Sequence, residues 1–299
     1  MSSFLGLSDP PSPVCIGRFK KICYQGGWIS SSCGERKFES YQGIRYGVSP
    51  VGDLRFKAPR PFIPDEGTYN VSQISKVSCP QINLNWWEKS KYNGQEDCLM
   101  LNIYTPEKNS SNLDNLPVMV WIHGGGFNFG SNQFKNFNPE HLVDKGVIVV
   151  TINYRLGAFG FLSLGDESVP GNAGLKDQIL ALSWIQEHIE SFGGDQKAVT
   201  IFGGSAGSYS ISALLISPLS KGLFHRAIGQ SGTMLATSWK TLLPDEALNI
   251  SSSFTQILGC QSNNLTCLQE QSIDAILFTL ETLDFRKYVS IFLLICIRK

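Results

Sequence analysis

The chain has 299 residues, of which 42% are hydrophobic and 17% are charged, so it can bury one large core or two smaller ones. Its 25 basic and 25 acidic residues cancel, which gives no electrostatic reason to expect nucleic acid or an anionic membrane surface as a partner. The longest apolar run begins at Tyr288 and is about half as long as a membrane-spanning helix, so we expect no membrane span.

The N-terminal part, up to about Pro64, is rich in turn residues and has no regular pattern. Its first residues do not resemble a signal peptide, because they lack a basic stretch and Asp9 and the following prolines break the apolar run. No segment further along looks like a linker. We therefore predict one domain over residues 1–299.

Short β-forming runs bounded by turn residues follow, and most of them are continuously apolar. That character is typical of strands buried on both faces of a sheet. The runs cover 98–106, 118–122, 147–152 and 199–202, and a weaker one lies in "RAIGQSG" at 226–232. These runs predict the strands of a central sheet.

Helical patterns lie between the strands. In "NAGLKDQILALSWIQEHIESFGGD" the apolar residues recur in steps of three and four, which defines one buried stripe. The stripe consists of Leu175, Ile179, Leu182, Ile185 and Ile189. The helix should end at Gly193-Gly194, and a second helix should start at Ser205. This alternation predicts an α/β fold with a mostly parallel central sheet flanked by helices.

The pentapeptide Gly203-Gly204-Ser205-Ala206-Gly207 joins the last of the strong strands to the second helix. A sharp strand–turn–helix connection exposes a serine hydroxyl, and its glycines relieve crowding. The helix N-terminus also directs backbone N–H groups toward negative charge. We interpret Ser205 as a candidate nucleophile and the N–H of Ala206 as a candidate oxyanion donor; the alternative is a glycine-rich turn capped by serine.

The stretch "HGGGF", residues 123–127, directly follows another buried strand. Consecutive glycines let the backbone approach a substrate and present its N–H groups. Gly125 and Gly126 are therefore candidates for further oxyanion donors, whereas the alternative is an ordinary flexible loop. Together with the pentapeptide, the stretch indicates a hydrolase-type site.

The eight cysteines form no C-x-x-C pair and only four histidines are present, so we expect no metal site. Potential N-glycosylation sequons, which permit secretion without proving it, occur at Asn70, Asn109, Asn249 and Asn264.

From about Phe38 to about Gly232 the chain resembles the type-B carboxylesterase family, which includes cholinesterases, juvenile hormone esterases and insect esterases. The motifs are "YQGIRYGVSPVGDLRFKAP", "QEDCLMLNIYTP", "WIHGGGFNFGS", "VTINYRLGAFGFLS", "GNAGLKDQILALSWIQEHIESFGGD", "VTIFGGSAGS" and "GLFHRAIGQSG". The resemblance implies an α/β-hydrolase fold, a small carboxylic ester as substrate, an acyl-enzyme intermediate and no cofactor. It also implies a secreted protein, in keeping with disulfides that need an oxidising compartment.

The resemblance also implies roles for individual residues. Ser205 becomes the nucleophile, with Gly125, Gly126 and Ala206 as the oxyanion hole. The implied disulfides and structural ion pairs are Cys79–Cys98, Cys260–Cys267, Arg55–Glu96 and Arg155–Asp177. Trp86 and Trp87 lie in the first disulfide loop, where we expect them to pack or line a pocket; the alternative is a cation–π contact with a substrate.

The sequence departs from the family pattern in two respects. Gly204 stands where the family usually has a glutamate that helps to organise the catalytic histidine. In addition, the triad order of α/β-hydrolases is serine, acid, histidine, but only His225 follows Ser205, too closely for an acid to intervene. His123, His141 and His188 precede the serine, so we expect the triad acid and histidine to be absent.

These departures suggest an incomplete carboxylesterase domain, truncated on its C-terminal side. Residues 1–37 would be a divergent N-terminal segment, and residues 285–299 a tail foreign to the family. We expect no ester turnover from these residues alone. The alternatives are a non-catalytic binding or adhesion relative and a scavenger that is acylated only once.

Overall fold

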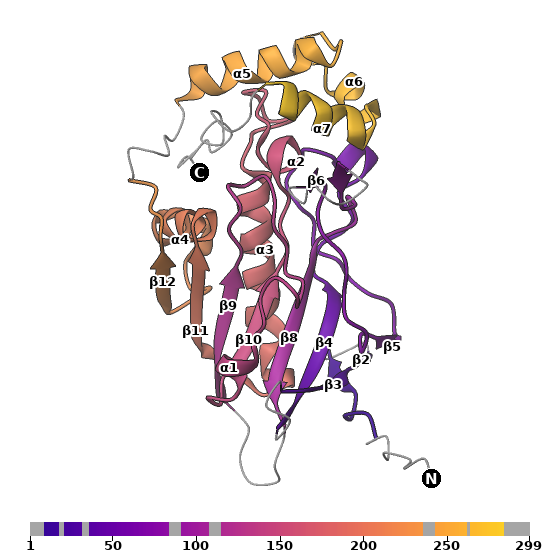
Figure 1. The fold of residues 1–299 in the computed structure, drawn as a ribbon, viewed down its shortest axis with the longest axis vertical. Coiled ribbons are helices and arrows are strands. Elements are labelled where there is room, and N and C mark those ends of the chain that lie inside the picture. Colours follow the sequence, from indigo (N-terminus) through magenta and orange to yellow (C-terminus); the bar gives the residue numbers. More distant parts are fainter. Residues whose placement is uncertain are drawn as a thin grey trace.

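A computed structural model describes residues 9–17, 21–31, 36–83, 91–107, 115–235, 243–261 and 264–283. Trp86, Trp87 and the segment 285–299 lie outside these residues, so their expected roles stay predictions. Figure 1 shows one central sheet with helices packed against it.

Within the described ranges, the central sheet has seven strands. In chain order they are β3 (Gly27–Ser30), β4 (Lys37–Arg45), β8 (Met100–Pro106), β9 (Leu116–Ile122), β10 (Ile148–Ile152), β11 (Gly194–Gly204) and β12 (Arg226–Gln230). In space their order is β12-β11-β9-β10-β8-β4-β3. The sheet is thus not laid down in sequence order, since β9 lies between β10 and β11.

The sheet is mixed, with a parallel and an antiparallel half. β12, β11, β9 and β10 run parallel to one another, whereas β10–β8, β8–β4 and β4–β3 pair antiparallel. Parallel neighbours need a crossover of a dozen residues or more, while antiparallel neighbours can be joined by short connections. The predicted parallel arrangement therefore holds for the half that carries the candidate site, and the turn-rich N-terminal part supplies antiparallel strands.

Two smaller sheets flank the central one. The first contains β1 (Val14–Ile16), β2 (Ile22–Gln25) and β5 (Gly67–Asn70), and the second contains β6 (Gln81–Ile82) and β7 (Tyr92–Asn93). The turn-rich N-terminal residues are thus organised around the edge of the main sheet.

The helices include one long helix and several shorter ones. They are α1 (Glu140–Val143), α2 (Gly157–Phe161), α3 (Ala173–His188), α4 (Ala206–Ile216), α5 (Pro244–Ile257), α6 (Leu265–Glu270) and α7 (Ile273–Thr282). The 3-10 helices are η1 (Gly52–Leu54), η2 (Ile189–Phe192) and η3 (Pro218–Ser220). Within the described residues, no helix is both long enough and apolar enough to cross a membrane.

Helix α3 forms where the apolar stripe predicts it. Leu175, Leu182 and Ile185 are buried in the main core together with Val120 and Ile201 of the sheet. The helix passes into η2, and Gly193 ends that turn with a φ of 88°, a left-handed conformation that glycine adopts readily. Strand β11 begins directly after this turn, at Gly194.

Helices α5, α6 and α7 lie at the end of the molecule toward which the parallel strands point (Figure 1). A disulfide between Cys260 and Cys267 closes the connection between α5 and α6. These helices therefore lie on the side of the sheet where the strand-to-helix turns are found.

Candidate functional site

Ser205 alone forms the turn between β11 and α4. Its backbone has φ 53° and ψ −119°, a combination that residues with a side chain rarely adopt. Its N–H donates to the carbonyl of Gln230 at 2.8 Å, and its own carbonyl accepts from the N–H of Tyr209 at 2.9 Å. The residue is exposed, although Gly203 and Ala206 on either side are buried. The turn therefore holds the hydroxyl at the surface, at the N-terminal end of α4.

Two glycines near Ser205 are required by packing. A Cβ added to Gly203 would lie 2.5 Å from the carbonyl oxygen of Ile122, and one added to Gly207 would lie 2.0 Å from the same oxygen. Both distances are shorter than any normal contact. The strand and the helix on the two sides of the turn can approach β9 this closely only because these positions lack side chains.

The loop 123–130 follows β9 and passes beside Ser205. A Cβ added to Gly124 would lie 3.3 Å from the Cβ of Ser205 and 2.6 Å from the carbonyl oxygen of Gly204. Gly125 and Gly126 have φ values of 103° and 59°. The structure thus brings the two glycine-rich stretches together, as the sequence predicts, and their roles as oxyanion donors stay predictions.

His123 fixes the start of this loop. It is 5% exposed, its ring stacks on Tyr154 with centroids 4.4 Å apart, and its Nδ1 lies 2.8 Å from the carbonyl oxygen of Gly124. Because a carbonyl only accepts, Nδ1 carries the proton. Burial lowers the pKa of His123 to about 4, so the ring is neutral at physiological pH. Its Nε2 is buried without a hydrogen-bond partner among the described residues.

The other three of the four histidines lie away from Ser205. The backbone N–H of His225 bonds to Val199 at 2.8 Å, at the opposite end of the β11–β12 pair. Because a strand rises about 3.3 Å per residue, this point is roughly 20 Å from Ser205. His188 ends α3 shortly before β11 begins, and His141 belongs to α1, which Figure 1 places at the same far end of the sheet.

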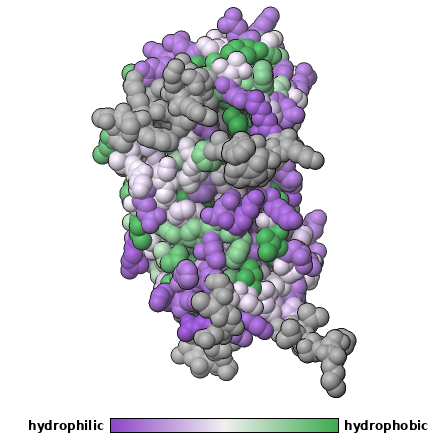
Figure 2. Space-filling view, viewed as in Figure 1, coloured by the Kyte–Doolittle hydropathy of each residue, from purple (hydrophilic) through white to green (hydrophobic). Residues whose placement is uncertain are grey.

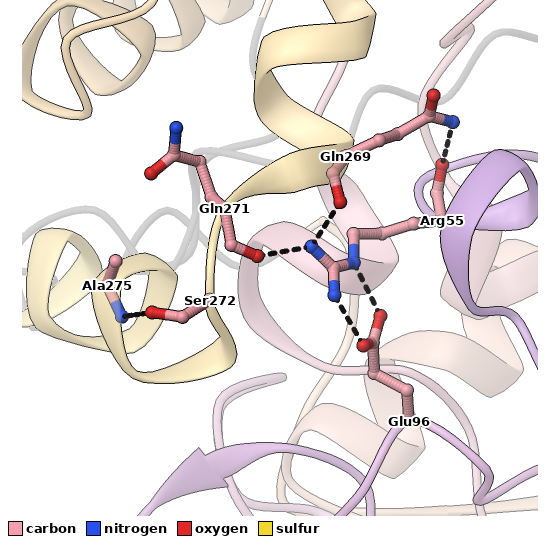
Figure 3. A network of polar contacts seen from close by, with 6 residues as sticks. All are labelled: Arg55, Glu96, Gln269, Gln271, Ser272 and Ala275. Atoms are coloured by element: carbon pink, nitrogen blue, oxygen red, sulfur yellow. Dashed lines mark hydrogen bonds and ion pairs between the residues drawn. The ribbon is translucent and has the colours of Figure 1, made fainter.

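The structure contains two buried ion pairs between the residues that the family resemblance pairs. Both Nε and Nη2 of Arg55 donate to the carboxylate of Glu96, each at 2.6 Å. Nη1 of Arg55 donates to the carbonyls of Gln269 at 2.8 Å and Gln271 at 2.6 Å. Figure 3 shows Arg55 at the centre of this network, which joins the N-terminal part of the chain to the α6–α7 connection.

The second pair, Arg155–Asp177, supports the start of α3. Asp177 accepts from Nε and Nη2 of Arg155 at 2.8 and 2.7 Å, and Nη1 of Arg155 donates to the carbonyl of Lys57 at 2.8 Å. The structure also contains an ion pair that sequence reasoning missed, between Arg45 and Asp97. The only sequence signal for it was the acidic residue beside Glu96, which could not identify a partner.

The described cysteines form three disulfides. The pairs Cys79–Cys98 and Cys260–Cys267 connect the residues that the family resemblance pairs. Cys15–Cys23 was not foreseen, because it depends on the antiparallel register of β1 and β2, in which these two residues face each other. Neither the composition nor the spacing of the cysteines reveals how these two strands pair.

A cavity of about 430 Å³ lies beside the glycine loop. Trp121, Gly124, Gly125 and Phe129 line it together with polar residues such as Gln81. The sequence gave no indication of this cavity, since its lining comes from three separate segments of the chain.

Comparison with known proteins links this arrangement to one family. The model described as the carboxylesterase family matches residues 25–296, a range that begins and ends inside the two segments expected to diverge. A juvenile hormone esterase from Tribolium castaneum is 44% identical over 289 residues, which cover 94% of this chain and 47% of that protein. A venom carboxylesterase from Apis mellifera is 40% identical over 250 residues, which cover 82% of this chain and 44% of that protein.

A solved structure agrees with these sequence relatives. The crystal structure of a juvenile hormone esterase from Manduca sexta, with OTFP covalently attached, has a TM-score of 0.81 and 33% identity. The comparison covers 93% of this chain and 52% of that one. The central fold is therefore that of an α/β-hydrolase esterase, and the chain spans about half the length of the relatives it matches.

Proposed function

Because this chain belongs to the carboxylesterase family, we propose that it serves the hydrolysis of small carboxylic esters through Ser205. The observation that carries the proposal is the exposed Ser205 in a strained turn, beside the glycine loop and at the start of α4. Strained backbone conformations are concentrated at functional sites. The covalent compound on the related juvenile hormone esterase supports a covalent mechanism.

In the proposed reaction, Oγ of Ser205 attacks the ester carbonyl carbon and loses its proton to a base. The N–H groups of Gly125, Gly126 and Ala206 stabilise the oxyanion, at roughly 3 kcal/mol or more for each effective donor. The C–O bond then breaks, the alcohol leaves with the proton, and water hydrolyses the acyl-enzyme. The buried or remote positions of the four histidines support the further proposal that full turnover uses a histidine–acid pair from outside these 299 residues.

The three disulfides support a further part of the proposal, which is that the protein works in an oxidising compartment. The name of the Apis mellifera relative, a venom carboxylesterase, is consistent with secretion. We propose a secreted protein, and reduction with a thiol reagent should shift its thermal unfolding to lower temperature.

The burial of His123 and the distance of the other three histidines from the exposed Ser205 favour a second candidate function, a scavenger that is acylated once. An incubation with a fluorophosphonate probe should give one adduct on Ser205, detected by peptide mass spectrometry, and Ser205→Ala should abolish it. An absent adduct contradicts both functions. Hydrolysis of p-nitrophenyl acetate beyond one equivalent, lost in Ser205→Ala, would instead reject the scavenger and the need for an external base.

A further inference from the structure

Gly204 directly precedes Ser205, and neither the backbone nor the packing requires a glycine there. It is absent from the glycines with positive φ, so its backbone suits any residue. Among the residues that the structure describes, a Cβ at this position would have two neighbours within 4 Å, Cη2 of Trp121 at 3.7 Å and the carbonyl oxygen of Gln230 at 4.0 Å. Both are ordinary contacts. Gly204 therefore relieves no clash, unlike Gly203 and Gly207, and instead leaves open space beside the candidate nucleophile.

The indole of Trp121 forms a fixed wall of this space. Trp121 is directly opposite Phe202 in the β9–β11 register, and alternate residues of a strand share one face, so Phe202 and Gly204 face the same side. The ring of Phe137 stacks on the indole with centroids 4.6 Å apart. The ring of Phe202 packs against the indole as well, with centroids 5.0 Å apart. Because two aromatic rings hold the indole, its edge toward Gly204 stays in place.

The same indole also lines the cavity of about 430 Å³, together with Gly124 and Gly125. Gly124 is in turn packed against the Cβ of Ser205. The cavity and the space over Gly204 therefore share one aromatic wall, and the glycine loop separates the cavity from the serine. The space over Gly204 therefore lies next to Ser205 and is bounded by an aromatic side chain.

We propose that Gly204 and Trp121 form a specificity site for esters with a branched or aromatic group directly attached to the reacting carbonyl. The group lies over Gly204 and packs against the edge of Trp121. Aromatic and aliphatic groups gain from this burial in proportion to the area removed from water. This inference rests on the proposed function, since it takes Oγ of Ser205 as the nucleophile.

The test compares two fluorophosphonates that carry either a methyl or a phenyl group on phosphorus. The rate of Ser205 labelling is measured for both by intact mass spectrometry. Gly204→Leu fills the space and should slow the phenyl probe at least about 10-fold relative to the methyl probe, within the range by which pockets discriminate substrate size. Gly204→Ala, whose Cβ fits without a clash, should change the ratio in the same direction by a smaller factor.

Thr200→Leu is the matched control. Thr200 lies on the same strand and face as Gly204 but roughly 13 Å away, so added volume there should leave the ratio unchanged. Equal slowing of both probes in the Gly204 variants, or a preference of the wild type for the methyl probe that they do not alter, overturns the specificity site and leaves the proposed function intact. A wild-type chain that neither probe labels overturns both.

Discussion

At the scale of single residues, the proposed nucleophile Ser205 occupies a turn that costs stability. Its φ of 53° and ψ of −119° belong to a region that glycine adopts readily and other residues avoid. Such strain costs on the order of 1–3 kcal/mol and persists only because the surroundings enforce it. The hydrogen bonds of the Ser205 backbone to Gln230 and Tyr209 are part of that enforcement.

Replacing Ser205 should reveal the strain. We expect Ser205→Gly to be more stable than Ser205→Ala by about 1 kcal/mol, because glycine relieves the backbone although it has more entropy in the unfolded chain. Urea unfolding of the two variants, neither of which can be labelled by a phosphonate, measures the difference. If Ser205→Ala proves the more stable variant, the turn is not strained in solution.

His123 should make stability depend on pH. Burial lowers its pKa from 6.5 to about 4, so the unfolded chain binds this proton more tightly than the folded chain. Stability contributed by the neutral ring is therefore complete above about pH 6.5 and is lost as the pH falls toward 4, by about 3 kcal/mol in total.

The variant His123→Asn tests this effect, because its amide can still donate near the position of Nδ1 but does not titrate. Denaturant unfolding between pH 7 and pH 4 should show a smaller loss for the variant than for the wild type. His188→Gln is a comparison variant: burial lowers the pKa of His188 in the same direction, so its replacement should also reduce the loss of stability at low pH. An equal loss in wild type and His123→Asn contradicts the prediction.

At the scale of elements, the Arg55 network attaches the α6–α7 connection to the sheet end of the molecule. The side chains of Arg55 and Glu96 are only 9% and 7% exposed, so each would be a buried, unpaired group without the other. The guanidinium also donates hydrogen bonds to the backbone carbonyls of Gln269 and Gln271 (Figure 3). Removing one partner of this pair should therefore destabilise the folded protein strongly.

Arg55→Leu should lower the free energy of unfolding by about 3–5 kcal/mol. Hydrogen exchange should increase in α6 and α7 before it increases in α3, since the lost bonds hold the former. Arg45→Leu is the matched control: its pair with Asp97 is 30% and 36% exposed, and its loss should cost about 1 kcal/mol or less. Similar costs for the two variants would show that the carbonyl contacts contribute nothing.

Sequence reasoning succeeded for elements whose pattern is local. The apolar stripe of α3, the continuous strands β9 and β10, and the turn around Ser205 all follow from spacing and glycine chemistry. The antiparallel half of the sheet, the Cys15–Cys23 disulfide and the partner of Arg45 depend on register between distant segments, which a single sequence does not encode visibly. The open space at Gly204 likewise required coordinates, because a sequence does not reveal whether a glycine relieves a clash.

At the scale of the whole molecule, one edge of the sheet carries exposed apolar side chains. Leu215 and Ile216 of α4 are 59% and 49% exposed, and Ile228 of β12 is 45% exposed. Among the described strands, β12 pairs only with β11, so its other side is an unpaired edge. Figure 2 shows apolar patches between polar residues across the middle of the viewed face, where the strands run. Apolar edges of this kind favour association.

We expect the chain to self-associate at micromolar concentration. Ile228→Lys should reduce this association, because a charge on an edge strand opposes pairing with another strand. Light scattering coupled to size exclusion measures the effect, and Ile63→Lys is the control, since Ile63 is 77% exposed but lies in a loop away from β12. A monomer that is unaffected by either substitution contradicts the prediction.

The reach of Arg55 also has a consequence for biosynthesis. Its carbonyl partner on Gln269 is 214 positions later in the chain. At about 5–20 residues per second, a ribosome delivers that partner roughly 10–40 s after Arg55 itself. During this interval Glu96 is the only member of the network able to neutralise the guanidinium, and the nascent sheet end stays uncovered. The interval is long enough for a chaperone to bind there, so translation speed through α5 and α6 should influence the yield of folded protein.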